Sequence, residues 1–168
     1  MKTTIIRVVL IILLVLTVIL IFNFSNQNGT TSGGVSRRVS KILIDIFPWT
    51  KNLNEETKND LVEKSQFCVR KTAHVSIYTL VGILLMSLMN TYEVSNRYRF
   101  LITVFIGASY AGLDEFHQWF IPGRSASVID VGIDSCGVLL GSLLVFVINK
   151  SRRFYRKNNS WLIYELDI

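Results

Sequence analysis

Long blocks of mostly apolar residues dominate this chain, without the regular alternation of a soluble amphipathic helix or strand. The blocks cover approximately residues 5–24, 73–89, 98–120 and 128–148. An α-helix needs about 17–25 residues of this kind to cross a bilayer, so each block has spanning length, the third only because it includes Asp114 to Gln118. The pattern predicts an all-α membrane protein, folded as a bundle of four transmembrane helices.

The first block also fits the core of a cleaved signal peptide, so two interpretations compete. No pair of small residues at cleavage spacing follows the block, and the chain continues with the polar residues 23–27. We interpret the block as an uncleaved first transmembrane helix.

The segment between the first two blocks predicts a long extracellular loop that contains amphipathic helices. Residues 26–34 are polar and glycine-bearing, which predicts irregular structure. Over residues 35–47, apolar positions recur at helical spacing opposite Arg37, Arg38 and Lys41, as in a helix on a membrane surface. Asn54 precedes two glutamates and can cap a helix that continues into the second span.

Charge and composition narrow the class further. The chain has 168 residues, 50% of them hydrophobic, and a net charge of +6, which fits one small membrane domain over residues 1–168. The basic residues flank the apolar blocks and gather in a tail over residues 149–168, where anionic lipid is a nearer partner than nucleic acid. Their density near the span ends predicts a multi-pass protein with both termini in the cytoplasm.

Polar residues concentrate around a turn between the third and fourth blocks. The stretch from Asp114 to Asp134 holds four carboxylates, a histidine and an arginine, and charges so close to a span usually have a partner and a function. Because spans alternate in direction, four helix ends that carry polar residues meet at one membrane face. We predict a polar cup there, formed by Ser25, Gln27, Arg70, Lys71, His74, Tyr78, Asp114, Glu115, His117, Gln118, Arg124, Ser125, Asp130 and Asp134.

Helical spacing supports this convergence. Polar residues of the second, third and fourth spans each form one stripe at intervals of three or four positions, which places them on one face of their helix. Gly137 and Gly141 continue the last stripe and permit close helix contact beneath the acids. Arg124, Lys71 or a histidine would be needed to keep the carboxylate of Asp114 charged at that depth.

These motifs resemble the VanZ-like family of small bacterial membrane proteins. The resemblance covers nearly the whole chain and is carried by Arg70-Lys71-x-x-His74-x-x-x-Tyr78, Asp114-Glu115-x-His117-Gln118, Pro122-Gly123-Arg124-Ser125, Asp130-x-x-x-Asp134-x-x-Gly137-x-x-x-Gly141 and Ser25-x-Gln27. At the position of Asp134 the family commonly has Asn. The resemblance implies a Gram-positive plasma-membrane protein, associated with resistance to lipid-tailed glycopeptides such as teicoplanin.

Three classes of function are compatible with the predicted cup. In the first class, its charges only hold the helices together. In the second class, the cup binds or shields a membrane lipid, a lipid-linked cell-wall precursor or a lipoglycopeptide. In the third class the protein is an enzyme on a lipid-linked substrate, with His117 or Glu115 as general base and Asp114 orienting the histidine. The ligand spacing matches no metal template, so we expect neither metal nor cofactor. The sequence leaves the oligomeric state open.

Overall fold

The computed structural model describes residues 2–158, and every regular element among them is a helix. The all-α class predicted from the sequence is therefore confirmed. The elements, in chain order, are α1 (Lys2–Ser25), α2 (Gly29–Ile46), the 3-10 helix η1 (Pro48–Thr50), α3 (Glu55–Met89), α4 (Asn96–Gln118) and α5 (Val128–Asn158). The last ten residues of the predicted basic tail lie outside the described part of the chain.

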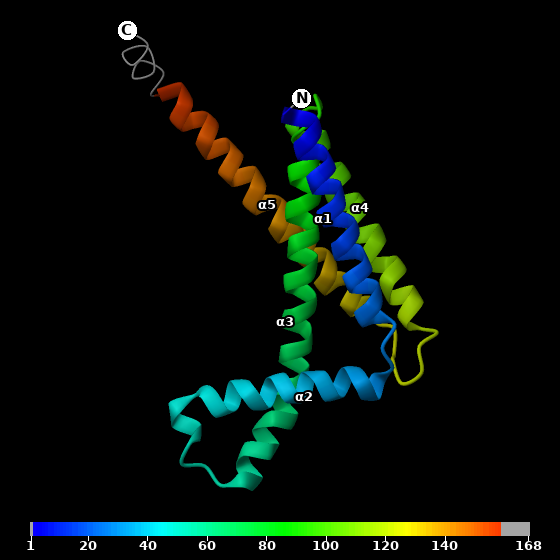
Figure 1. The fold of residues 1–168 in the computed structure, drawn as a ribbon, viewed down its shortest axis with the longest axis vertical. Coiled ribbons are helices and arrows are strands. Elements are labelled where there is room, and N and C mark those ends of the chain that lie inside the picture. The colour runs from blue at the N-terminus through cyan, green and yellow to red at the C-terminus, as the bar shows by residue number, and fades with distance from the viewer. Residues whose placement is uncertain (1, 159–168) are drawn as a thin grey trace.

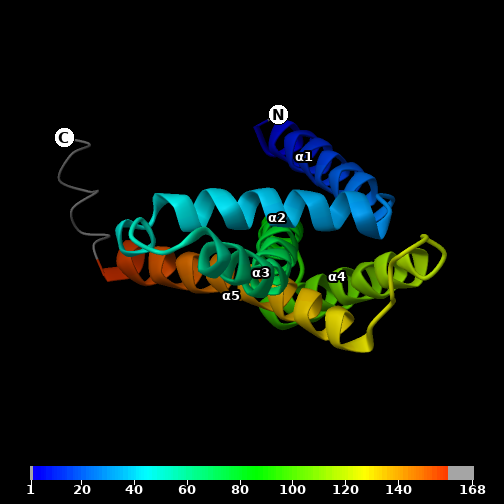
Figure 2. The ribbon, with the colours of Figure 1, turned by 90° about the horizontal axis from the view of Figure 1, so that it is seen from below.

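Three long helices run side by side, and α2 crosses α3, whose first turns continue beyond it (Figure 1). Figure 1 shows α1, α3 and α4 aligned along the long axis, while α5 crosses α3 and then diverges from the bundle. In both views α2 runs nearly perpendicular to α3 (Figures 1 and 2). The start of α1 and the end of α5 lie at the opposite end of the molecule (Figure 1).

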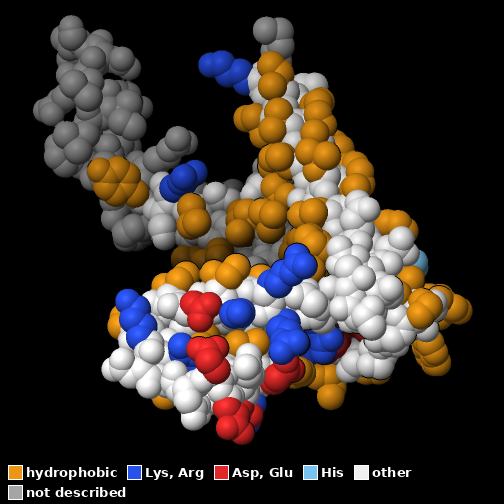
Figure 3. All heavy atoms as spheres, turned by 60° about the horizontal axis from the view of Figure 1, so that its bottom comes forward, with side chains coloured by type: hydrophobic (Ala, Val, Ile, Leu, Met, Phe, Trp, Pro, Cys, Tyr) orange, Lys and Arg blue, Asp and Glu red, His pale blue; other side chains and the backbone are white. Residues whose placement is uncertain are grey.

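Three helical segments are long and apolar enough to cross a membrane: Lys2–Ser25, Glu55–Met89 and Val128–Arg152. The 23-residue α4 is not among them, although it matches the third predicted span in position. Its last turns carry acidic and amide side chains that face the protein interior. Figure 3 shows charged side chains gathered over the end formed by α2 and the start of α3, with hydrophobic side chains along the helices above.

The first loop is more ordered than the sequence predicted. The prediction of irregular structure over residues 26–34 is wrong beyond Asn28, because α2 already begins at Gly29. The Asn28 side chain caps this helix by accepting a hydrogen bond from the Thr31 amide at 2.8 Å. The cap predicted at Asn54 is confirmed, since its side chain accepts from the Thr57 amide and α3 continues unbroken into the apolar segment.

Glycines allow α3 and α5 to pack backbone against backbone. A Cβ atom added to Gly141 would lie 2.1 Å from the Thr79 carbonyl oxygen, and one added to Gly82 would lie 2.2 Å from the Val138 carbonyl oxygen. No larger residue fits at these positions without moving a helix. The close contact predicted beneath the acids is thus confirmed, and it fixes the register between the polar ends of α3 and α5.

Candidate functional site

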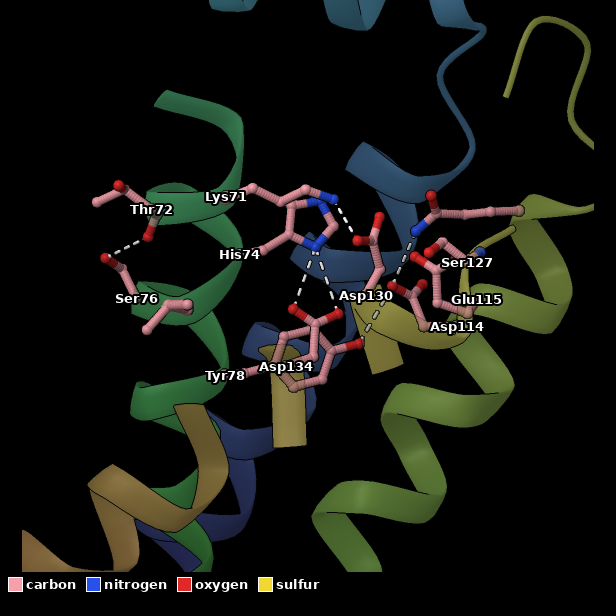
Figure 4. A network of polar contacts seen from close by, with 12 residues as sticks. Lys71, Thr72, His74, Ser76, Tyr78, Asp114, Glu115, Ser127, Asp130 and Asp134 are labelled. Atoms are coloured by element: carbon pink, nitrogen blue, oxygen red, sulfur yellow. Dashed lines mark hydrogen bonds and ion pairs between the residues drawn. The ribbon is translucent and has the colours of Figure 1, made fainter. Parts of the chain in front are cut away.

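Two polar side-chain contacts join α3 to α5 just above the glycine contact. Lys71 forms an ion pair with Asp130, and His74 Nδ1 lies 3.3 Å from the carboxylate oxygens of Asp134 (Figure 4). Residues three and four apart share a helix face, so the spacing of the two α3 side chains matches that of the two acids on α5. Asp134 is completely buried, so its charge depends on this contact.

A third contact joins α3 to α4 at greater depth. Tyr78 is fully buried, and its hydroxyl donates a hydrogen bond to the Asp114 carboxylate at 3.1 Å. Gln118, one helical turn further along α4, donates to the same Asp114 oxygen at 3.2 Å. Two hydrogen-bond donors therefore satisfy this buried carboxylate, which is 6% exposed.

Arg124, in the loop between α4 and α5, ties three parts of the molecule together. Its guanidinium donates to the carbonyl oxygens of Gln27 at 2.9 Å and Phe24 at 2.7 Å, and to the Gln118 side chain at 2.9 Å. It makes no ion pair with Asp114; Gln118 stands between the two groups. The direct pairing of Arg124 with Asp114 suggested by the sequence is therefore absent, and the Gln118 side-chain amide bonds to both groups instead.

The charge of Arg124 is held in a half-buried position. Burial lowers the pKa of its guanidinium, and the neighbouring charge of Arg70 lowers it further. An arginine side chain nevertheless stays protonated in proteins, so Arg124 places a permanent positive charge at the end of the bundle.

Glu115 and Ser25 are among the buried polar residues with an atom that has no hydrogen-bond partner in the described part of the chain. Glu115 accepts a hydrogen bond from the Ser127 amide at 2.9 Å with one carboxylate oxygen, while its other oxygen is unpaired. The hydroxyl of Ser25 is also unpaired, although the residue is only 2% exposed. A buried hydroxyl without a partner favours a site that is completed by water or a ligand.

His117 lies outside this network. Its ring stacks on Phe22 of α1, with centroids 5.0 Å apart, and its Nε2 has no partner among the described residues. Asp114 bonds to Tyr78 and Gln118 instead. The arrangement predicted from the sequence, in which Asp114 orients His117, is therefore absent from the described structure.

A cavity of about 560 Å³ opens between α1, α2 and α3 beneath this polar end. Its walls are mostly apolar and include Val35, Val39 and Leu43 of α2 and Ile77 of α3. Its polar end is lined by Ser25, Gln27, Arg70, His74, Tyr78, Asp114, Gln118 and Arg124. Eight of the predicted site residues therefore meet at the polar end of an apolar chamber, whereas Glu115, His117 and Asp134 line neither this cavity nor its neighbour.

A second cavity of about 310 Å³ adjoins the first at the mouth of the bundle. Polar side chains dominate its lining, which adds Lys71, Ser125, Ser127 and Asp130. The two cavities share the residues Ser32, Arg70, His74, Gln118 and Arg124. Together they form an amphipathic site, with a polar chamber at the end of the bundle and an apolar chamber behind it.

Arg70 is the shared residue best placed to meet a ligand. It is exposed and makes no hydrogen bond or ion pair with any residue of the described chain, whereas Lys71 and Arg124 are already engaged. Arginine can form two parallel hydrogen bonds to a phosphate or carboxylate.

The sequence did not reveal that α2 forms one wall of the site. Val35, Val39 and Leu43 follow a four-residue spacing and all line the apolar cavity, whereas Ile42 and Ile46 line neither cavity. That spacing was the available signal. The amphipathic pattern alone did not distinguish contact with lipid from contact with a cavity of the protein.

Fold and site together define a helical membrane protein with an amphipathic cavity and a charged rim at one end of its bundle. The VanZ/LLP1 family model matches residues 10–149, and the chain belongs to this family. No curated protein and no solved structure matches the chain.

Proposed function

We propose that this protein binds the phosphate-bearing headgroup of an envelope lipid or lipid-linked cell-wall precursor. The observation that carries the proposal is the pair of adjoining cavities, one polar and one apolar, that share Arg70, His74, Gln118 and Arg124. A lipid has the same division into a charged head and an apolar tail. The polar chamber would take the phosphate, and the apolar chamber of about 560 Å³ would take the first part of the tail.

The charges of the rim support an anionic headgroup. Arg70 offers an unengaged guanidinium at the boundary of the two chambers. Arg124 donates three hydrogen bonds within the protein, which leaves two of its five N–H groups for a ligand. Lys71 is neutralised by Asp130, so its contribution is smaller.

The membrane arrangement that suits this function has four spans, with α4 as the third. In this arrangement the termini lie in the cytoplasm of a Gram-positive cell and the polar chamber opens on the outer face. The inward-facing acids of α4 explain why its composition alone does not mark it as a span. At the outer face the protein would contribute to resistance against teicoplanin-type glycopeptides by occupying or shielding a lipid-linked precursor.

Native mass spectrometry of the purified protein tests lipid binding. Wild-type protein should retain phosphatidylglycerol or a polyprenyl phosphate in preference to a neutral diacylglycerol. Arg70→Gln should abolish that preference, because it removes the unengaged charge of the site. Arg38→Gln is the matched control: it removes the same charge from an exposed position of α2 that lines neither cavity. Equal retention of charged and neutral lipids by the wild type would refute the proposal.

A further inference from the structure

We infer that His74 is the proton-transfer group of a hydrolytic site for phosphate esters of lipids, located where the two cavities meet. The inference rests on the proposed function, because the phosphate must first be held by the polar chamber. It assigns to His74 a step that binding alone does not require.

The contact with Asp134 fixes which nitrogen of His74 is basic. Nδ1 lies 3.3 Å from both carboxylate oxygens of Asp134. A carboxylate only accepts hydrogen bonds, so Nδ1 carries a proton and Nε2 of the neutral ring is left with a free lone pair. In Figure 4 this second nitrogen lies on the side of the ring away from Asp134. A buried carboxylate that holds one nitrogen also orients the ring, as in other sites where histidine moves protons.

The position of His74 suits a ligand bound as proposed. His74 and Arg70 line both cavities, and they lie one turn apart on α3. A phosphate held by Arg70 would therefore be next to the imidazole. His117 has no comparable position, since it lines neither cavity and stacks on Phe22.

The reaction needs only the lipid substrate and water. As the water oxygen forms a bond to phosphorus, its proton passes to Nε2 of His74 while Nδ1–H stays bonded to Asp134. The bond between phosphorus and the leaving oxygen then breaks, and Nε2 returns the proton to that oxygen. A diester yields an alcohol and a phosphate monoester, and a diphosphate yields two phosphates. The histidine ends in its initial protonation state.

Turnover and binding can be measured on the same preparation. The full-length protein in lipid nanodiscs is supplied with phosphatidylglycerol or a polyprenyl diphosphate, and phosphorus NMR follows the products. His74→Asn keeps an N–H group near the position of Nδ1 but cannot transfer a proton. We expect its kcat to fall about 100-fold or more, the usual contribution of general acid–base catalysis, with KM and lipid retention unchanged. His74→Gln is the second variant if the first is poorly folded.

The other histidine provides the matched control, because the chain has only two. His117→Asn should leave kcat unchanged. Asp134→Asn tests the positioning role: kcat should fall while KM stays constant, whereas a purely structural defect would lower lipid retention and thermal stability as well.

The outcomes separate the two claims. Lipid retention without any product from either probe would overturn the hydrolytic role and leave the binding function standing. Failure to retain either probe would overturn both. Turnover that survives in both His74 variants, or that falls equally in His117→Asn, would remove His74 from the reaction.

Discussion

Replacing Arg124 by lysine should destabilise the protein although the charge is kept. Three hydrogen bonds from the guanidinium join the loop after α4 to the end of α1 and to Gln118. Two of the acceptors, Phe24 and Gln27, are carbonyl groups at or just beyond the last turn of α1, and the Phe24 oxygen also accepts a hydrogen bond from the Gln27 amide at 3.3 Å. An ammonium group reaches about one of the three acceptors, so two bonds are lost.

The size of the effect follows from those two bonds. A hydrogen bond with a charged partner contributes about 1.5–3 kcal/mol, so the loss has an upper limit of about 3–6 kcal/mol. Arg124 is only half-buried, and water can replace part of what is lost. We therefore expect the free energy of unfolding to fall by about 2–4 kcal/mol. For a chain of this size, that lowers the melting temperature by roughly 4–16 °C.

Thermal unfolding in a mild detergent, followed by circular dichroism, measures this shift. The control is Arg38→Lys, the same substitution at an exposed position of α2. If Arg124→Lys melts at the same temperature as the control, the guanidinium does not hold the loop against α1, and the geometry argued for this end of the bundle is wrong.

Three further results are expected. Gly141→Ala should lower the free energy of unfolding by about 1–3 kcal/mol or more in a denaturant titration, because its Cβ would overlap the Thr79 carbonyl oxygen, whereas Gly132→Ala has open space and should be neutral. Tyr78→Phe should cost about 1–3 kcal/mol in the same titration, since it removes a donor from buried Asp114. Alkaline phosphatase fused after residue 27 or 121 should be active, and fused after residue 168 inactive; the reverse pattern would invert the membrane orientation.

The contacts between α3 and α5 at the polar end could be predicted from the sequence, because the spacing of residues along a helix determines which of them share a face. The intervals from Lys71 to His74 and from Asp130 to Asp134 place each pair on one helix face, and alternating spans bring those faces together. The glycine contacts followed from the same logic, since Gly141 continues the stripe of Asp134.

Other features depend on side-chain choices that spacing does not determine. His117 and Asp114 are neighbours on α4, yet the histidine stacks on Phe22 while the acid bonds to Tyr78. Arg124 bonds to a backbone carbonyl group in the last turn of α1, 100 residues away in sequence, which no local pattern encodes. The apolar cavity arises only when α2 folds across the bundle, so its volume had no signature in the sequence.

Photocrosslinking tests the central claim most directly, because it reports where a bound lipid lies. A phosphatidylglycerol with a diazirine in its acyl chain is incubated with the protein in nanodiscs, illuminated, and located by peptide mass spectrometry. The account predicts labelling of the cavity wall, at Val35, Val39 or Ile77, and loss of this labelling in Arg70→Gln. Labelling confined to the exposed face of α4, for example at Phe105, with no change in Arg70→Gln, would contradict a lipid site inside the bundle.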